Sequence, residues 1–148
     1  MTPPCFLAVG ESAEYTRTIT QDDILAFSRI SGDDDPVHVD PGFAARTAFG
    51  RCIAHGAHVM GLLSTTASMM SRRSVQRGAT GTPVSAGYER IRFTRAVFAG
   101  DTLTARYVIE EVDAARARTR AALQVVNQDG ETCLVGTHIL AWVPPMAG

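Results

Sequence analysis

The chain has 148 residues, of which 45% are hydrophobic and 20% are charged, and its formal net charge at pH 7 is -1. A chain of this length and composition is expected to fold as one domain, residues 1–148, without a disulfide or a metal to hold its core. The nearly neutral charge offers no electrostatic attraction to polyanions, so neither nucleic acid nor an anionic membrane surface is an expected partner.

The cysteines predict a reducing environment. Cys5, Cys52 and Cys133 are odd in number and lack C-x-x-C spacing, so neither a disulfide framework nor a zinc site is expected. The N-terminal residues show no basic region followed by an apolar stretch, which argues against a secretory signal. Residues 52–71 are uncharged but contain two His, two Gly and five Ser or Thr, which is too polar for a lone membrane helix. We therefore expect a cytoplasmic protein.

The first half of the chain is expected to begin with a short strand over residues 14–20, where polar and mixed residues alternate. A helix follows, with Thr20 as its predicted N-cap and Gly32 as its end. The proline within residues 35–39 predicts an extended or turn-like segment there.

Two further helices and one loop are expected next. Residues 41–46 predict a short helical turn, and residues 56–70 predict a buried helix. Residues 71–82 are polar and Gly-rich without periodicity, which is typical of a loop.

The second half of the chain is strand-like. Alternating patterns occur over residues 85–95, 102–110 and 116–121, and a turn at residues 127–130 leads into a fourth run over residues 132–143. One long buried helix followed by a meander of strands predicts an α+β fold, in which an antiparallel sheet curls around the helix.

Residues 30–40, ISGDDDPVHVD, place four aspartates and one histidine in eleven residues. Asp33 and His38, on the two sides of a Pro-containing turn, can bring a carboxylate and an imidazole to one water, which is the minimum for acid/base work. Two other interpretations are a solvated acidic turn and a metal loop that also uses Asp35. A calcium loop counted from Asp33 would need Gly and Glu where His38 and Ala44 stand, so that interpretation fails. Spacing alone leaves the other interpretations open.

His55 and Gly56 directly precede the uncharged helix. Gly56 permits close approach of a ligand to the unpaired N–H groups at the helix start, where a developing negative oxygen would be stabilised. It equally permits a buried helix to begin close to a sheet. Ser64, about two turns further on, either reaches residues 30–40 or serves as a small packing residue. His55 and His58 offer two metal ligands, but no third ligand follows at a recognised spacing.

Residues 31–38, SGDDDPVH, resemble the G-D-x-N-P-x-H signature of the MaoC-like, (R)-specific enoyl-CoA hydratases. The resemblance continues through residues 38–45, HVDPGFAA, and residues 49–56, FGRCIAHG, which are similar to the family's F-x-x-x-I-x-H-G. Residues 91–103, IRFTRAVFAGDTL, are similar to its RF-x-x-P-V-x-x-G-D-T-L. These stretches occur in the family's order and spacing, so the combined pattern is far more specific than any one of them.

The resemblance implies a hot dog fold, in which an antiparallel sheet wraps around one long central helix. It also implies a homodimer with an acyl-thioester tunnel near the dimer interface. The implied enzyme is a lyase of fatty acid metabolism that reversibly hydrates a trans-2-enoyl-CoA to the (3R)-3-hydroxyacyl-CoA. Its substrate is an acyl-CoA or acyl-carrier-protein thioester, and neither a metal nor another cofactor is expected.

The resemblance also assigns roles to residues. Asp33 and His38 hold and activate the water that adds to the β-carbon, and the backbone N–H of Gly56 binds the thioester oxygen. Ser64 supports the site, and His55 and Asp35 belong to the set that binds substrate. These residue types suit the chemistry, because addition passes through an enolate-like state whose charge gathers on the thioester oxygen.

Two departures from the family pattern raise questions. Asp35 stands where the family has Asn, and it either shifts the pH optimum upward or only caps the turn. Ala96 replaces the usual Pro, which we expect to loosen a strand end. The arginines of the expected loop either contact coenzyme A phosphates or are solvated: Arg72, Arg73 and Arg77. Two alternative functions are a hot dog thioesterase and a non-catalytic subunit that binds acyl thioesters.

Overall fold

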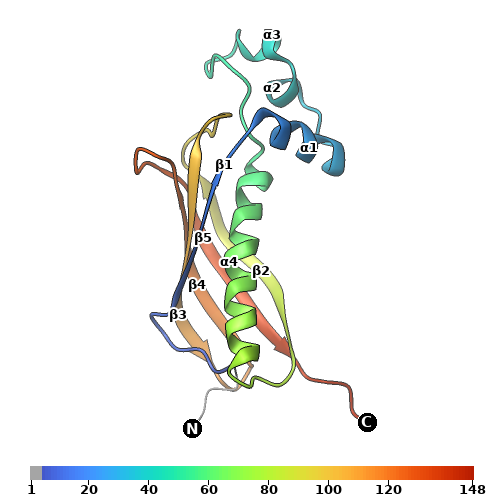
Figure 1. The fold of residues 1–148 in the computed structure, drawn as a ribbon, viewed down its shortest axis with the longest axis vertical. Helices are drawn as coiled ribbons and strands as arrows, with labels where there is room; N and C mark the ends of the chain where they lie inside the picture. Colours follow the sequence, from blue (N-terminus) through green and yellow to red (C-terminus); the bar gives the residue numbers. More distant parts are fainter. Residues whose placement is uncertain (1–4) are drawn as a thin grey trace.

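One antiparallel sheet wraps around one long helix in the computed structural model, which describes residues 5–148 (Figure 1). The strands lie in the order β1-β3-β4-β5-β2, and every neighbouring pair is antiparallel. The elements in chain order are β1 (Ser12–Thr18), α1 (Gln21–Ser31), α2 (Pro36–Val39), α3 (Pro41–Ala44), α4 (Gly56–Gln76), β2 (Thr82–Phe93), β3 (Thr102–Asp113), β4 (Arg118–Val126) and β5 (Thr132–Val143). This is the predicted α+β arrangement.

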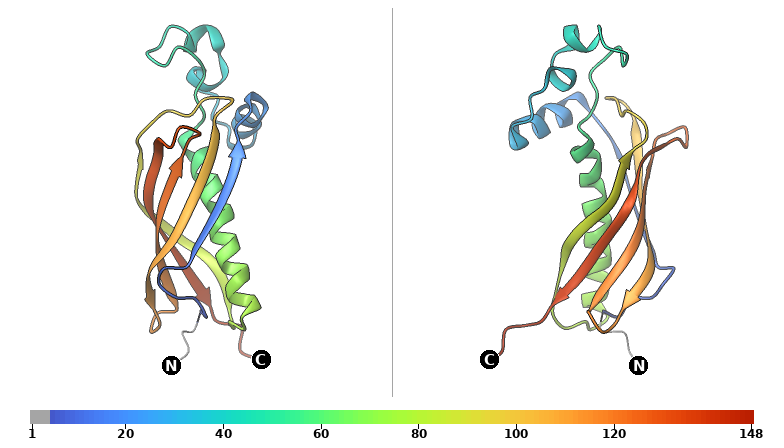
Figure 2. Two further views of the ribbon diagram at one scale, coloured as in Figure 1. Left: turned by 60° about the vertical axis from the view of Figure 1, so that its left-hand side comes forward. Right: turned by 180° about the vertical axis from the view of Figure 1, so that it is seen from behind.

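The central helix α4 lies along the concave face of the sheet, and the strands curve around it (Figure 2). Alternate residues of β3 point toward it and are at most 1% exposed, as the sequence predicts: Leu103, Ala105, Tyr107 and Ile109. They share one hydrophobic cluster with Leu62, Leu63 and Met70 of α4. Burial of each large apolar side chain contributes about 1.5–3 kcal/mol, so this contact fixes the helix on the sheet.

The short helices gather at one end of the molecule, beyond the first residue of α4 (Figure 1). Helix α1 has the expected bounds: the Thr20 side chain accepts from Asp23 N–H at 3.0 Å, and the Asp23 carboxylate accepts from Thr20 N–H at 3.1 Å. Gly32 ends the helix with a φ of 82°, in the left-handed region that glycine tolerates best.

The structure sharpens one sequence prediction and corrects another. The extended or turn-like segment predicted over residues 35–39 contains a single helical turn, α2, because Asp35 caps the turn and Pro36 fits the first helical position. Residues 71–76 were expected to be a loop, but they continue α4. There the Ser74 hydroxyl donates to Cys5 O and accepts from Trp142 Nε1 at 2.9 Å, so a polar residue is used inside the core.

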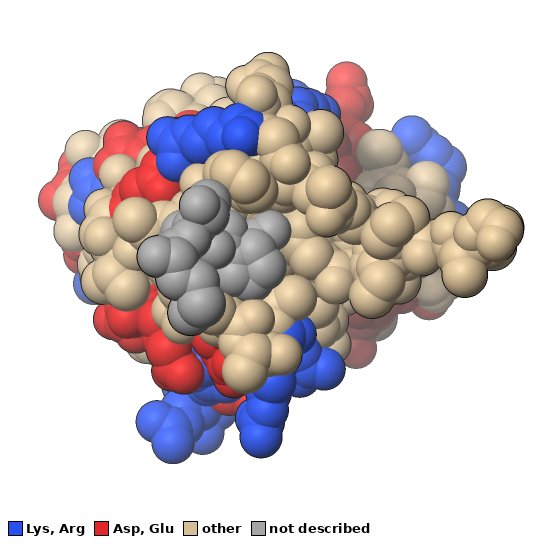
Figure 3. All heavy atoms as spheres, turned by 90° about the horizontal axis from the view of Figure 1, so that it is seen from below, with Lys and Arg blue, Asp and Glu red and all other residues tan. Residues whose placement is uncertain are grey.

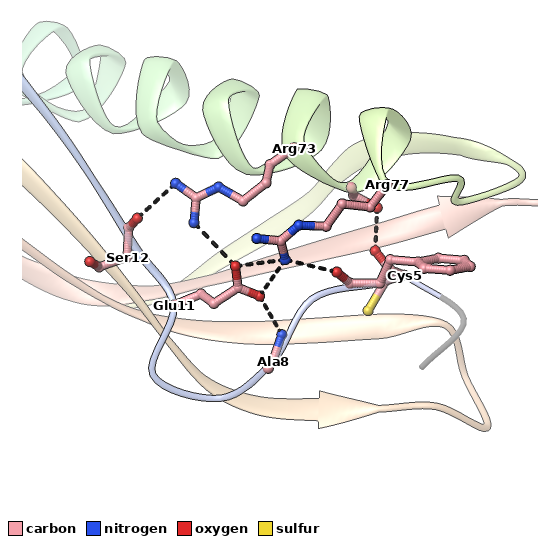
Figure 4. A network of polar contacts seen from close by, with 8 residues as sticks. Cys5, Ala8, Glu11, Ser12, Arg73 and Arg77 are labelled. Atoms are coloured by element: carbon pink, nitrogen blue, oxygen red, sulfur yellow. Dashed lines mark hydrogen bonds and ion pairs between the residues drawn. The ribbon is translucent and has the colours of Figure 1, made fainter. Parts of the chain in front are cut away.

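The last turn of α4 is tied to the N-terminal segment by an ion-pair network (Figure 4). Glu11 accepts from Ala8 N–H at 2.7 Å and pairs with Arg77 at 2.8 Å and with Arg73 at 3.4 Å. Burial acts to raise the pKa of the Glu11 carboxyl, but the Ala8 hydrogen bond and the two arginines outweigh it and hold the pKa below its usual range. The network therefore favours the ionised carboxylate.

The three cysteines are free and buried in the described chain. No helix within residues 5–148 is long and apolar enough to cross a membrane.

A buried histidine on β5 lies outside the groups that the sequence singles out. His138 is 0% exposed, and its ring nitrogens lie 2.7 Å from Ser85 Oγ and 2.9 Å from the Tyr107 hydroxyl. Burial lowers the pKa of His138 to about 4, because the charged imidazolium would lose its hydration. The ring is therefore neutral at physiological pH, with one nitrogen donating and the other accepting.

We predict that this histidine makes the protein sensitive to acid. Its folded pKa lies below the unfolded value near 6.5, so the unfolded chain binds the proton more readily and stability falls as the pH drops below about 6.5. The contribution of His138 to the free energy of unfolding should fall by about 2 kcal/mol between pH 7 and pH 5, because each pKa unit corresponds to about 1.4 kcal/mol. Urea unfolding of His138→Gln at several pH values should show a flatter dependence than wild type. An equal slope in the two proteins would contradict this assignment.

Candidate functional site

The candidate site lies where residues 33–55 meet the first turn of α4, at the end of the molecule that carries the short helices (Figure 1). Asp33 follows the αL residue that ends α1, and His38 lies in α2. The Asp33 carboxylate is exposed and accepts from Asp35 N–H at 3.2 Å. The turn therefore holds the carboxylate in place while it remains open to solvent.

His38 is fixed in a state that suits a general base. Its Nδ1 lies 2.7 Å from Ile53 O. Because a carbonyl oxygen only accepts, Nδ1 must carry the hydrogen, and in the neutral ring the lone pair is on Nε2. A backbone contact from outside α2 thus selects the tautomer.

His55 completes a group with these two residues. Its Nε2 lies 2.9 Å from Asp33 O, and its ring stacks on that of His38 with centroids 3.8 Å apart. One carboxylate oxygen and one nitrogen from each ring all lie within 4.8 Å of one another. The structure therefore brings Asp33 and His38 together as the sequence predicts, and it adds His55, which at 2% exposure is buried behind His38.

Three potential ligands this close raise the question of a metal ion. The two imidazole rings are stacked with planes only 24° apart, so their in-plane lone pairs lie in two nearly parallel planes and do not converge well on one point. Tetrahedral or octahedral coordination needs converging lone pairs. The arrangement is thus better suited to holding a water between Asp33 and His38, and the expected lack of a metal stays a prediction.

Gly56 is the first residue of α4 and lines a pocket of about 470 Å³ together with His38, Phe93 and Arg95. The N–H groups of His58 and Val59 bond to His55 O at 3.0 and 3.1 Å. The N–H groups of Gly56 and Ala57 stand at the positive end of the helix dipole, and both residues line the pocket. The helix start can therefore donate to a negative oxygen bound there.

The glycine at this position has a second, steric role. A Cβ built on Gly56 would lie 2.7–2.9 Å from ring carbons of Phe93, the last residue of β2. Phe93 lies within a stretch that matches the family pattern, but the sequence alone gave no role for it. The contact makes the phenyl ring one wall of the pocket next to the helix start.

Ser64 is not brought to this group within the chain. It is exposed on α4 and lies outside the lining of the pocket. Eight residues of helix separate it from Gly56 by about 12 Å along the axis. A supporting role for Ser64 stays a prediction.

Asp35 caps α2, since its carboxylate accepts from Val37 N–H at 3.1 Å. This contact is the cap expected for it, while the upward shift of the pH optimum stays a prediction. The structure gives the carboxylate a local backbone partner in the same turn that carries Asp33 and His38.

The arginines proposed for coenzyme A phosphates lie at the wrong end of the helix for this site. Arg73 lies in the last turn of α4 and Arg77 directly follows the helix. Glu11 holds both, about 25–32 Å from Gly56 along the axis. At that end of the molecule, acidic and basic side chains are interspersed around the rim (Figure 3). Within one chain they therefore do not form a phosphate-binding patch for the pocket.

Comparison with known proteins gives consistent matches. The family model described as a MaoC like domain matches residues 8–130. A 3-hydroxybutyryl-CoA dehydratase of Methylorubrum extorquens is 31% identical, over 90% of this chain and 75% of its own length. An (R)-specific enoyl-CoA hydratase of Aeromonas caviae is 28% identical, over 90% of this chain and 94% of its own length.

Two solved structures share the fold along nearly the whole chain. The (R)-hydratase from Aeromonas caviae superposes with a TM-score of 0.78 at 27% identity, covering 93% of this chain and 98% of that one. The unliganded R-hydratase from Pseudomonas aeruginosa gives a TM-score of 0.77 at 31% identity, covering 99% and 92%. The predicted hot dog fold is confirmed.

We predict that Gly56 and Phe93 are energetically coupled. Gly56→Ala should push the Phe93 ring aside, at a cost of about 1 kcal/mol, because the ring is 55% exposed and able to turn. The same substitution should cost less in a Phe93→Ala background, which removes the ring atoms nearest to the new methyl group. A double-mutant cycle by urea unfolding isolates this pairwise effect from the change in helix propensity. Additive effects would show that the ring is not constrained by the glycine.

We also predict that the cap at position 35 tolerates an amide. Asp35→Asn should change the free energy of unfolding by only a few tenths of a kcal/mol, since Asn caps helices about as well as Asp. Asp35→Ala should destabilise the protein by about 1 kcal/mol, because Val37 N–H loses its acceptor. Equal stabilities for the two variants, measured by thermal or urea unfolding, would contradict the capping role.

Proposed function

The chain belongs to the family of MaoC-like domains, and from this premise we propose that it is a hydro-lyase that reversibly hydrates a trans-2-enoyl-CoA to the (3R)-3-hydroxyacyl-CoA. The observation that carries the proposal is the placement of Asp33 beside a His38 ring whose Nδ1 is committed to Ile53 O. A carboxylate and a neutral imidazole with a free lone pair are what activation of a water requires.

In the proposed reaction, a water bound between the Asp33 carboxylate and His38 Nε2 loses a proton to this pair as its oxygen bonds to the β-carbon. The electrons of the double bond shift toward the thioester, and the oxygen there gains negative charge. The N–H of Gly56, at the start of α4, donates to that oxygen. The pair then returns one proton to the α-carbon, which balances the addition of water.

The proton transfers and the oxyanion contact involve only groups of the protein and the substrate, so we propose no cofactor. General acid/base catalysis contributes about 10²- to 10⁴-fold, and loss of one oxyanion donor typically costs about 3 kcal/mol. The proposed substrate carrier is coenzyme A or an acyl carrier protein. The free, buried cysteines support the proposal of a cytoplasmic location.

We further propose that the protein acts as a homodimer through the β2 edge and the adjoining face of α4. Strand β2 is the last in the sheet, and Val84 and Phe93 on it are 40% and 55% exposed. The outward face of α4 carries small exposed residues, including Gly61, Ser64 and Ser68. An edge strand beside such a face is suited to pair with a second copy, which would also cover Ser64.

The proposed activity can be tested with crotonyl-CoA. The purified protein should remove the absorbance of the conjugated enoyl group without releasing free thiol. Release of thiol would instead indicate a thioesterase. No change in either signal, over several acyl chain lengths, would favour a subunit that binds thioesters without turning them over.

We predict that Asp33→Asn and His38→Gln each lower turnover at least ~100-fold while the proteins remain folded, because each removes one partner of the activated water. Asp34→Asn is the matched control, since the neighbouring carboxylate is also exposed and undergoes the same change of charge. Steady-state rates with crotonyl-CoA measure the turnover of each variant, and circular dichroism shows whether it is folded. A near-normal rate in either test variant would remove that residue from the mechanism.

A further inference from the structure

We propose that His55 is a positioning residue, which aligns the Asp33 carboxylate with His38 instead of contacting the substrate. The proposal rests on the hydratase function proposed above and assigns this histidine a different role from the one expected of it. Three contacts and its burial carry the argument.

The first contact ties His55 to the segment that bears the carboxylate. Its Nε2 lies 2.9 Å from Asp33 O. The carbonyl can only accept, so Nε2 carries the hydrogen and the bond has a fixed direction. The backbone that carries the Asp33 side chain is therefore restrained from the N-cap of α4.

The second contact supports the imidazole of the acid/base pair. The His55 and His38 rings stack with centroids 3.8 Å apart, while His38 Nδ1 is held by Ile53 O, two residues before His55. The stack blocks one face of His38, and the hydrogen bond fixes its rotation in the plane. One short segment thus sets both degrees of freedom of the ring.

The third contact is with Phe27, and together with burial it separates His55 from the substrate pocket. Phe27 of α1 packs on the ring with a centroid separation of 4.7 Å, and only 2% of the residue is exposed. His55 is also absent from the lining of the pocket that His38 and Gly56 share. A substrate in that pocket meets His38, with His55 behind it.

Two substitutions separate the hydrogen bond from the stack. His55→Gln keeps an amide N–H in place of Nε2 but loses the ring, and His55→Phe keeps a ring but loses the donor. We expect each to lower kcat by about 10-fold or more with KM changed less than about threefold, because small misplacements of reacting groups act on the transition state. His58→Phe is the control: its ring stacks on the same Phe27, 5.4 Å away, and it should leave kcat near the wild-type value.

Combined variants distinguish positioning from direct participation. A residue that acts only through Asp33 and His38 has nothing left to position once one of them is lost, so His55→Phe should add little to the defect of Asp33→Asn or His38→Gln. Losses that multiply, a normal kcat in folded His55 variants, or a defect confined to KM would each overturn the proposal.

A measurement that does not depend on catalysis tests the positioning role of His55 separately from the proposed hydratase function. The ring-nitrogen NMR resonances of His38 should change in both His55 variants and stay unchanged in His58→Phe, whether or not crotonyl-CoA is hydrated. Unchanged His38 resonances would overturn the positioning role even in an active enzyme. A wild-type protein that does not hydrate enoyl thioesters would instead contradict the proposed function.

Discussion

Burial of α4 against the concave face of the sheet is the interaction on which the rest of the structure depends. Alternate residues of β3 and the inner side of α4 form one apolar cluster, and this contact fixes where the helix begins. Gly56 and the donors of the first turn therefore stand at a defined place beside the end of β2. The Glu11 network at the opposite end of the helix opposes displacement along its axis. Because the packed helix is rigid, the position of its first residue is fixed.

The residues proposed for catalysis lie mainly outside the sheet and α4, in segments that ordinarily tolerate motion. Three hydrogen bonds cross-link these segments: His38 Nδ1 to Ile53 O, His55 Nε2 to Asp33 O, and Ile53 N–H to Val37 O at 3.2 Å. They join residues 33–38 to the stretch that leads directly into α4. The geometry of the site is consequently transmitted from the packed core through the backbone, with His55 at the junction.

The sequence predicts features whose causes are local. Alternation over residues 102–110 identifies the buried side of β3, and Thr20 and Gly32 mark the ends of α1. The pattern of residues 71–76 predicts a loop because their polar side chains have distant partners that the sequence does not reveal, such as Cys5 for Ser74 and Glu11 for Arg73. The stack of His55 on His38 and the approach of Phe93 to Gly56 are likewise invisible in spacing, because they depend on how α4 meets the neighbouring segments. The motif therefore names the reacting residues, and the tertiary structure explains how they are held.

The carboxylate of Asp35 is a further case in which the motif names a residue and the structure explains how it is held. An amide is usual there in the family, and the structure assigns this side chain to Val37 N–H, a bond that either group makes. The N–H of Asp35 in turn donates to Asp33 Oδ1, so the backbone of the turn supplies a donor to each carboxylate. Because both donors are main-chain groups, replacing the amide by a carboxylate preserves the turn that presents Asp33. The turn thereby leaves Asp33 as the carboxylate that faces His38, and the additional negative charge is held at the start of α2, where a helix dipole favours it.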